Sequence, residues 1–456
     1  MSVSLSPIGG AGWQFFDNNG NPLTGGKIYT YDAGTTTPQT TYTSSAGNVA
    51  QANPIVLDSA GRVPSGEIWL TSGQRYKFVL ETSSGVLLGT YDNVSGINEN
   101  QFLMVSNFSS FSAALSFIGS SSASLIIDEP VSISANVTIP SNVNLVFENG
   151  GRFNVTGNST VSINGTVSAG AYQIFNAPTI VLAVYATNTP ASITNNVIFG
   201  GVSRPEVNPR WWGAGGTSDD SIALQAALWC ITQGSPGITV RLEDNVTYTV
   251  STSMVVDTDY FRLTGGPGST IKRKDNVPAD TMTVLTTGFL GRYTWGPGYP
   301  LTNMRFDNFE VDGNKANNVI GVNDNFENCV NALYLSQSRI ENLTVRNALR
   351  FGIAISNSSD VIAQGNIVAA CDEGGLYAEV GARIIFDSNK ITDTPIAPWN
   401  IGSLTFNFIS QGVISNNISV GALDGIYIRN ECDSVSIVGN TVVSPTRYGI
   451  WLRPLS

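Results

Sequence analysis

Apolar and polar residues alternate in short runs along the C-terminal third of the chain, and this pattern repeats about every 23 residues. A glycine followed by apolar, variable and apolar residues recurs after 23, 50 and 24 residues, at Gly352, Gly375, Gly425 and Gly449. An asparagine before a strand-like run follows a similar interval, at Asn342, Asn366, Asn389, Asn417 and Asn440. Self-similarity at this period is typical of stacked solenoids. Because the runs are rich in Ile, Val, Thr and aromatic residues, without helical periodicity, they predict a parallel β-helix.

The pattern predicts an all-β chain in three parts. Residues 1–97 contain strand-like runs between turn clusters rich in Gly, Asn and Asp, which predict a small antiparallel β domain. Residues 98–208 contain shorter alternating runs, which predict a linker and a short β-solenoid or β-roll. Residues 209–456 would then form the β-helix, with about nine coils at the observed period.

One helix is expected at the start of the β-helix. Asp219 and Asp220 follow Thr217 and Ser218 and precede an Ala- and Leu-rich run over 221–229. Side-chain oxygens bind the free N–H groups at a helix start, and carboxylates oppose the positive end of the helix dipole. We therefore expect these two acids to cap a short helix rather than to act in catalysis.

Composition narrows the possible chemistry. The sequence has no histidine, which excludes Ser-His and Cys-His catalysis and histidine metal ligands. The four cysteines lack CxxC spacing, so we expect buried, inert thiols and neither a metal nor a cofactor: Cys230, Cys329, Cys371 and Cys432. A net charge of −11 disfavours nucleic-acid binding, and no apolar run has the length needed for membrane insertion.

The repeat places particular side chains on the outside of the coil. When the glycines are aligned, an outward column contains Ala354, Tyr377, Tyr427 and Trp451, and a second column two residues further on contains Ser356, Glu379, Arg429 and Arg453. Aromatic rings beside Arg and Glu suit a sugar-binding face. The predicted substrate-binding residues are therefore Tyr377, Glu379, Tyr427, Arg429 and Trp451. The same residue types are enriched at protein interfaces, so an intersubunit surface remains an alternative.

Three carboxylates on turns before the glycines are candidates for catalysis: Asp372, Glu373 and Asp424, flanked by Trp399 and Tyr448. An inverting glycosidase places two carboxyl groups about 6.5–9.5 Å apart. Two coils would separate Glu373 from Asp424 by about 10 Å. The alternative is that these are ordinary solvated surface acids. The asparagine series is expected to be structural, with stacked amides that bind one another.

Short motifs in the chain resemble those of known families. GWQFFD at 12–17, LTGGKIYTY at 23–31 and PIVLD at 54–58 are similar to the N-terminal attachment module of bacteriophage tailspikes and tail fibres. WWGAGGTSDD at 211–220 resembles the start of pectate-lyase-like right-handed β-helix proteins, in which a short helix covers the open end of the coil.

The resemblance implies a homotrimeric tailspike in the virion tail that acts at the host cell surface after synthesis in the host cytoplasm. Residues 1–97 would attach to phage tail proteins such as the portal, adaptor or tail tube, and the β-helix would bind bacterial surface polysaccharide. Many relatives also cleave it, which here would require carboxylates acting as a hydrolase or lyase. An architectural tail connector and a free pectate-lyase-like enzyme are the alternatives. Because the sequence stops after a repeat strand, we expect the β-helix to continue past residue 456 or to be covered there.

Overall fold

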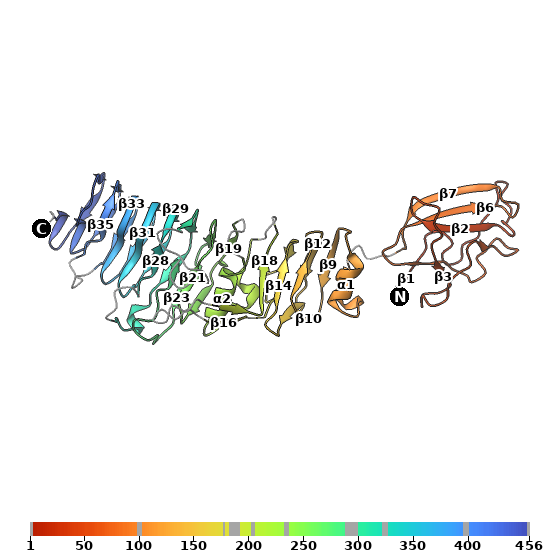
Figure 1. Ribbon diagram of the computed structural model, residues 1–456, viewed down its shortest axis with the longest axis horizontal. Coiled ribbons are helices and arrows are strands. Elements are labelled where there is room, and N and C mark those ends of the chain that lie inside the picture. The colour runs from red at the N-terminus through yellow and green to blue at the C-terminus, as the bar shows by residue number, and fades with distance from the viewer. Residues whose placement is uncertain are drawn as a thin grey trace. The chain divides into compact units, whose positions relative to one another are not determined.

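The computed structural model describes most of the chain (Figure 1), in the ranges 3–97, 103–176, 178–181, 192–201, 206–231, 237–287, 300–321, 327–394 and 401–453. The chain divides into two compact units, Met1–Gln101 and Phe102–Ser456. The expected boundary at residue 208 does not coincide with a division between compact units, and the three-part division remains a prediction. No helix in the described ranges is long and apolar enough to cross a membrane.

The first unit consists of two antiparallel sheets, as the alternating pattern predicts. One has the order β4-β2-β6-β7 and the other β1-β5-β3. Their strands are β1 (Val3–Leu5), β2 (Lys27–Asp32), β3 (Thr41–Tyr42), β4 (Ile55–Val56), β5 (Trp69–Thr71), β6 (Tyr76–Glu81) and β7 (Leu87–Val94). Ile28, Ile68, Leu70, Tyr76 and Phe78 are buried in one core.

The second unit begins with a short parallel solenoid. Its elements are β8 (Leu103–Met104), η1 (Val105–Asn107), α1 (Phe111–Ile118), β9 (Ala123–Ile127), β10 (Pro130–Ile133), β11 (Val137–Ile139), β12 (Val143–Phe147), β13 (Arg152–Val155), β14 (Thr160–Ile163), β15 (Val167–Ser168), β16 (Thr179–Val181), β17 (Ser192–Thr194) and β18 (Asn196–Phe199). Strands β8, β9, β12 and β15 stack in parallel, as do β11, β14 and β18. Buried residues at alternate positions of β12 and β14 fill the interior.

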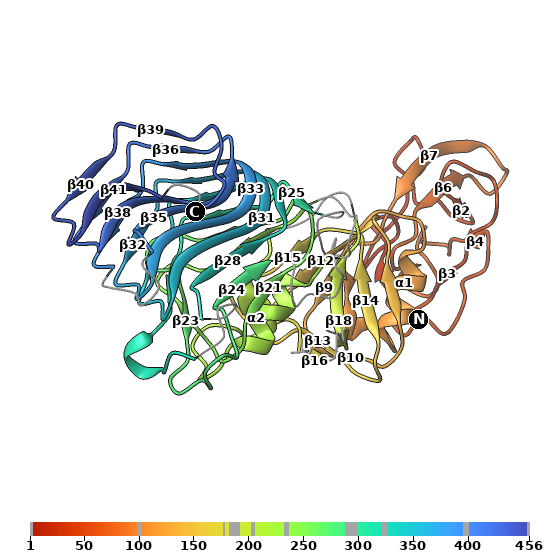
Figure 2. The ribbon, with the colours of Figure 1, turned by 60° about the vertical axis from the view of Figure 1, so that its left-hand side comes forward.

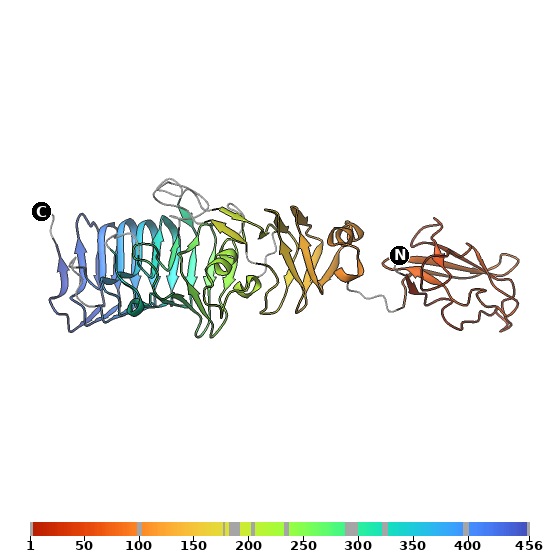
Figure 3. The same cartoon turned by 90° about the horizontal axis from the view of Figure 1, so that it is seen from below.

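A helix joins this solenoid to the β-helix. After η3 (Pro209–Trp212), α2 (Ser221–Leu228) is buried except at Ile222. One hydrophobic core runs from Val105 to Ile426 past this helix. The helix therefore lies within a continuous core, whereas the resemblance implies a cover over an open end (Figure 3). The first helical N–H, that of Ser221, donates to Asp219 Oδ1 at 3.1 Å.

Asp220 has a different structural role from the expected cap. It occupies the residue before the helix, but its side chain makes no cap hydrogen bond. Its carboxylate instead accepts hydrogen bonds from Gly215 N, Thr217 Oγ1 and Thr249 N at 2.9, 2.6 and 3.0 Å. Asp220 thus ties the glycine-rich loop to the first coil of the β-helix.

The β-helix follows, as the repeat predicts. Its elements are β19 (Thr239–Arg241), β20 (Thr247–Val250), β21 (Met254–Val256), β22 (Arg262–Thr264), β23 (Thr270–Arg273), β24 (Leu285–Thr287), β25 (Leu301–Thr302), β26 (Arg305–Asp307), β27 (Glu310–Asp312), η4 (Lys315–Asn317), β28 (Val330–Leu333), β29 (Leu335–Glu341), β30 (Thr344–Arg346), β31 (Phe351–Gln364), β32 (Ile367–Ala369), β33 (Gly374–Asp387), β34 (Lys390–Thr392), β35 (Leu404–Ser410), β36 (Val413–Ser415), β37 (Ile418–Val420), β38 (Asp424–Arg429), β39 (Ser436–Val438), β40 (Thr441–Val443) and β41 (Tyr448–Leu452).

These strands form two large parallel sheets in the described ranges. The path β19-β22-β26-β29-β31-β33-β35-β38-β41 runs through a 15-stranded sheet, and β20-β23-β27-β30-β32-β34-β37-β40 forms an eight-stranded sheet. Figure 2 shows β36 and β39 on one side of the coil, with β32 and β40 on another. Between β31 and β33, Ile353 pairs with Leu376 and Ile355 with Ala378, so residues one repeat apart are neighbours.

The turns of the coil recur at fixed positions with left-handed backbone conformations. One such series contains Asn308, Asn342, Gly365, Ser388, Asn416 and Gly439, with φ between 53° and 67°. L-residues generally disfavour this conformation, whereas Gly and Asn adopt it readily. The abundant Gly and Asn of the sequence are therefore explained in part by the corners of the coil.

The asparagine series is a buried hydrogen-bonded ladder, as expected. The Nδ2 atoms of Asn366, Asn389 and Asn417 each donate at 2.9 Å to the Oδ1 atom of the next member, which for Asn417 is Asn440. The prediction that Asn342 belongs to this ladder was wrong. It lies in the neighbouring corner series, and Leu343 N instead donates to Asn366 Oδ1 at 3.0 Å.

The repeated glycine is required by close packing between the sheets at Gly352, Gly375 and Gly425, but not at Gly449. A Cβ atom at Gly352 would lie 2.4 Å from Val368 Cγ1, and one at Gly425 would lie 2.4 Å from Val442 Cγ1. Non-bonded carbon atoms are essentially never this close, so a side chain at either position would push the two sheets apart. The glycine marker thus reflects packing rather than chemistry at a site.

Candidate functional site

The outward column predicted from the repeat is present. Register pairing places Ala354 beside Tyr377, Tyr377 beside Thr405, Thr405 beside Tyr427, and Tyr427 beside Trp451. Thr405 fills the position that the irregular repeat left open. Tyr377 and Tyr427 therefore face the same side of the coil, two coils apart.

The two tyrosine rings are nevertheless covered, contrary to the expectation of an open sugar-binding face. Tyr377 is 8% exposed and Tyr427 is 1% exposed. Tyr377 stacks on Phe351 at 4.5 Å between ring centroids, and Tyr427 stacks on Trp451 at 4.3 Å. Trp451 is the register partner of Tyr427, whereas Phe351 pairs with Gly374 and its ring reaches across to that of Tyr377 on the adjacent coil. Burial, and next the charge of Glu379, raises the pKa of the Tyr377 hydroxyl.

The second column forms a polar ladder that is more accessible. Asn407 Nδ2 donates to Glu379 Oε1 at 2.9 Å and to the Tyr377 hydroxyl at 3.1 Å. Asn430 Nδ2 donates to Asn407 Oδ1 at 2.7 Å. Arg429 lies with its guanidinium carbon 5.8 Å from the Tyr427 ring centroid, and its buried Nε atom has no hydrogen-bond partner among the described residues. Glu379, Arg429 and Asn430 are half-buried and reach the surface.

Asn407 was not among the predicted residues because the coil that leads to it is longer than its neighbours, and Asn430 lies one residue beyond the predicted column. Leu376 pairs with Leu404, and Leu404 pairs with Ile426. The first of these two intervals exceeds the repeat, and the second falls just short of it. The apolar-variable-apolar triplet at 404–406 also lacks the preceding glycine of its neighbours, so its register could not be assigned from the repeat alone.

The proposed catalytic pair is not aligned in the structure. The pairing of Leu376 with Leu404 and Ile426 places Asp424 in the column of Gly374, one residue out of register with Glu373. Glu373 is buried, and its Oε1 atom accepts a hydrogen bond from Arg350 Nη1 at 2.5 Å. These positions differ from the arrangement expected of two acids facing one bond.

Asp424 and Asp372 also have arginine or lysine partners. Asp424 is fully buried and binds Arg447 through both carboxylate oxygens. Asp372 Oδ1 lies 2.6 Å from Lys315 Nζ. All three candidate carboxylates are thus held in ion pairs, and their catalytic roles remain predictions. Trp399, expected beside them, lies outside the described residues.

An aromatic platform lies at the end of the outward column. Tyr448 is 47% exposed, and its ring centroid lies 5.4 Å from that of the half-buried Trp451. The Arg447 guanidinium lies 4.5 Å above the Trp451 ring, within the range of a cation–π interaction. Because Tyr427 stacks on the Trp451 ring and Arg447 lies over it, the apolar ring surface that this platform offers is chiefly that of Tyr448, beside a fixed positive charge.

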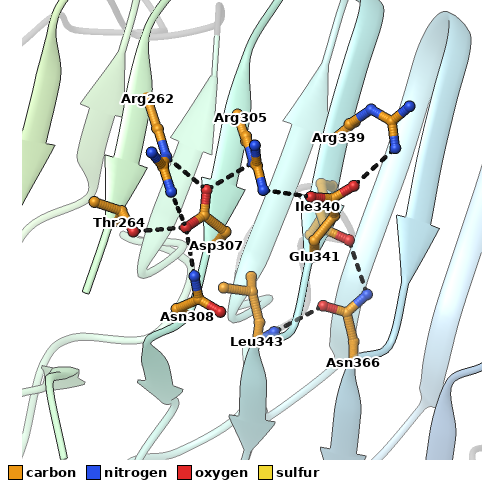
Figure 4. Close-up of polar contacts among 10 residues, drawn as sticks. All are labelled: Arg262, Thr264, Arg305, Asp307, Asn308, Arg339, Ile340, Glu341, Leu343 and Asn366. Carbon is orange, nitrogen blue, oxygen red and sulfur yellow. Dashed lines mark hydrogen bonds and ion pairs between the residues drawn. The ribbon is translucent and has the colours of Figure 1, made fainter. Parts of the chain in front are cut away.

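A second cluster of charged residues, absent from the sequence predictions, lies earlier in the β-helix (Figure 4). Arg262, Arg305 and Arg339 are register partners on consecutive strands β22, β26 and β29. Two residues further on, Asp307 and Glu341 are also partners. These arginines are unevenly spaced along the chain, at intervals longer than the repeat, so no sequence pattern indicated that they align.

The cluster is a continuous chain of ion pairs. Arg262 binds both oxygens of Asp307 at 2.8 and 2.9 Å, and Arg305 bridges Asp307 and Glu341 at 2.8 and 3.0 Å. Arg339 binds Glu341 at 2.9 Å. Burial alone would raise the pKa of Asp307, but hydrogen bonds and charge from Arg262, with help from Thr264, lower it below its usual value.

The thiols have the environments expected of inert cysteines. Cys230, Cys329 and Cys371 are buried, and Cys432 is half-buried. Burial raises the pKa of Cys371 to about 12 and that of Cys329 well above its usual value, so these thiols keep their protons near neutral pH. In the described ranges, no group of three or more His, Cys, Asp or Glu is placed to hold a metal ion.

Comparison with known proteins identifies similarities without establishing a family. A family model described as NosD, periplasmic copper-binding protein, matches residues 281–455, less than half of the chain. The described residues do not fit a copper site, because the sequence has no histidine and burial raises the pKa of the Cys329 and Cys371 thiols in the matched segment. No curated protein sequence matches this chain.

Solved structures with a partly similar backbone fold include two viral proteins and one bacterial surface adhesin. ORF18 of Geobacillus virus E2 is 14% identical with a TM-score of 0.33, over 54% of this chain and 61% of that one. The surface adhesin PfbA of Streptococcus pneumoniae is 11% identical with a TM-score of 0.37, over 76% and 91%. Tailspike protein 2 of bacteriophage CBA120, in its enzymatically active domain, is 14% identical with a TM-score of 0.27, over 60% and 45%. This chain thus spans less than two thirds of either viral chain, and similarities at this level do not assign an activity.

Proposed function

We propose that this chain is a bacteriophage tailspike whose right-handed β-helix binds bacterial surface polysaccharide. The observation that carries the proposal is the surface formed by Glu379, Arg429 and Asn430 together with the ring platform of Tyr448 and Trp451. Charged and amide groups there can bind sugar hydroxyls, and the exposed ring surface can pack on the apolar face of a sugar. The motifs over 12–58 support a virion-attachment role for residues 1–97, toward phage tail proteins such as the portal, adaptor or tail tube.

Binding is favoured over cleavage at the acids singled out from the sequence. Glu373 and Asp424 are buried in ion pairs and are out of register with each other. A general acid or a nucleophile must reach the glycosidic bond, and these geometries do not offer two free carboxyl groups on one face. We therefore propose an adhesin function acting at the host cell surface, from a virion tail location.

A homotrimer is part of the proposal. The outer face of the eight-stranded sheet carries Glu310, Asp312 and Arg346 in its earlier coils, but in later coils it exposes Ile367, Ile418 and Val443, with the exposed Lys390 between the first two. Exposed aliphatic residues beside a long, flexible lysine suit contact with another protein surface. A second and third copy of this chain are the partners that the tailspike proposal provides for this face.

Binding of the purified chain to intact host bacteria and to their extracted polysaccharide tests the proposal. We expect the Arg429→Gln variant to bind about tenfold more weakly, equivalent to about 1.4 kcal/mol. Arg152→Gln, which removes an exposed arginine from the preceding solenoid, is the matched control and should bind as the unaltered protein does. Absence of binding by the unaltered protein, or equal losses in both variants, would contradict the proposal.

A further inference from the structure

The arginine stripe, defined as Arg262, Arg305 and Arg339, presents positive charge to solvent although its ion pairs nearly balance. The three arginine side chains are 41%, 46% and 51% exposed, whereas the side chains of Asp307 and Glu341 are 0% and 11% exposed. The carboxylates are therefore buried while the guanidinium groups that bind them stay exposed, and Figure 4 shows the contacts that join them. This arrangement fixes the arginines in position while leaving their outer edges accessible.

The stripe is local and regular. In the same column, Thr239 precedes Arg262 and Ile362 follows Arg339, so the positive charge spans three coils. Consecutive strands are about 4.8 Å apart, which places the three cations at even intervals along the coil. Each guanidinium has five N–H donors, and the ion pairs described above use one or two of them. Such a row suits a ligand with repeated negative charges, even though the whole chain carries a net charge of −11.

A groove of about 560 Å³ lies at the corner that follows the stripe. Its lining combines polar side chains and glycine backbone with the apolar residues Pro267 and Phe309, and the polar side chains include Arg241, Ser269, Asn308, Glu310 and Asn342. Asn308 connects the groove to the stripe, because its Nδ2 atom donates to Asp307 Oδ1 at 2.7 Å. Amide and hydroxyl groups of this kind can bind the hydroxyl groups of a sugar.

We propose that the stripe and the adjoining groove bind an anionic glycan, with its acidic substituents on Arg262, Arg305 and Arg339 and its sugar hydroxyls in the groove. This inference rests on the proposed function, since it specifies the chemical class of the polysaccharide. The bidentate geometry of guanidinium groups suits both carboxylate and phosphate substituents. The site is separate from the polar ladder of Glu379 and Asn407.

Affinity measurements with defined polymers test the inference. Polygalacturonate supplies carboxylates, poly(glycerol phosphate) supplies phosphates, dextran supplies neutral sugar, and a single-stranded oligonucleotide supplies charge without a glycan. We expect binding to at least one of the two acidic polymers, weakening with added salt, and weaker binding to dextran and the oligonucleotide. The acidic polymer that binds more tightly shows whether the site prefers carboxylate or phosphate substituents.

Two variants separate this site from general charge effects. Arg339→Gln removes one cation, while Glu341 keeps its contact with Arg305, and should weaken acidic-polymer binding about three- to tenfold. Arg383→Gln removes a similarly exposed arginine, paired with Asp360 in another column, and should leave binding unchanged. Equal effects of the two variants, no effect of Arg339→Gln, preference for dextran or the oligonucleotide, or no binding of either acidic polymer would each overturn the inference. Binding to host cells that Arg429→Gln weakens and Arg339→Gln does not would retain the proposed function while rejecting this site.

Discussion

Asp424 is completely buried, and both of its carboxylate oxygens bind the guanidinium group of Arg447, one coil further along the chain. Tyr448 N donates a third hydrogen bond to the same carboxylate at 3.2 Å. A buried charge is tolerated only when it is paired and hydrogen-bonded. The pair thus joins strand β38 to the start of β41 and holds Arg447 over the Trp451 ring.

Replacement of Arg447 should destabilise the β-helix. Arg447→Met leaves the Asp424 carboxylate without its cation, so we expect the free energy of unfolding to fall by about 3 kcal/mol at neutral pH. The urea midpoint, followed by tryptophan fluorescence, measures the change. Arg383→Met, which breaks an exposed pair with Asp360, is the control and should leave the midpoint unchanged. Similar midpoints for the two variants would show that the Asp424 pair is not structural.

The interior of the asparagine ladder should be intolerant of substitution. Asn389→Ala removes hydrogen bonds to Asn366, Asn417 and Ala363 O from a fully buried position, with an expected cost of about 3 kcal/mol. Asn440→Ala changes the half-buried last member and should cost less. Thermal unfolding midpoints compare the two. A larger loss for Asn440→Ala would reject the ladder as a source of stability.

The repeated glycines offer a matched test of sheet packing. A Cβ atom at Gly425 would lie 2.4 Å from Val442 Cγ1 and 2.5 Å from Gly449 O, whereas one at Gly449 would meet no described atom within 4 Å. We expect Gly425→Ala to lower the free energy of unfolding by about 2 kcal/mol and Gly449→Ala to have little effect. Chemical denaturation of both variants measures this difference, and equal stability would contradict the packing explanation.

Asp219 should make stability depend on pH in the acid range. Burial alone would raise the pKa of Asp219, but hydrogen bonds from Ser221, Ser251 and Lys274 overcome burial and lower it from 3.8 to about 2. A group with a lowered folded-state pKa stabilises the fold above its unfolded-state pKa and loses that contribution as the pH falls. The contribution, about 1–2 kcal/mol after allowance for partial exposure, should therefore be present above pH 4 and disappear toward pH 2.

Comparison of unfolding midpoints at pH 7, 4 and 2 tests this dependence. Asp219→Asn should lower the midpoint at pH 7 and have a much smaller effect at pH 2, close to the pKa of the native carboxyl group, where most of its contribution has been lost. Asp360→Asn is the control. The pKa of Asp360 is also lowered, but this carboxylate lies in an exposed ion pair with Arg383. A pH-independent effect of Asp219→Asn would point to packing rather than to charge.

The repeat was sufficient to predict the β-helix, because residues one period apart become neighbours through backbone pairing alone. It also placed Tyr377 and Tyr427 on one side of the coil. It could not predict that their rings are covered, because stacking depends on Phe351 and Trp451 in adjacent coils. The glycine alignment already contained the one-residue offset between Glu373 and Asp424, but it could not show that both carboxylates are buried in ion pairs.

The arginine stripe and the position of α2 were beyond sequence reasoning for related reasons. The coils between Arg262, Arg305 and Arg339 differ in length from the repeat and from each other. The repeat therefore cannot show that these arginines align. A helix-start pattern indicates where α2 begins but not what packs on its far side. Only the folded chain shows that the preceding solenoid meets it there.

The unbroken core from Val105 to Ile426 has a mechanical consequence for residues 102–456. Tension or bending applied at one end would pass through the same interlocked side chains to the other, because one cluster of buried residues spans this whole distance. This part of the protein should therefore resist stretching and bending as one rigid body rather than as several segments joined by hinges.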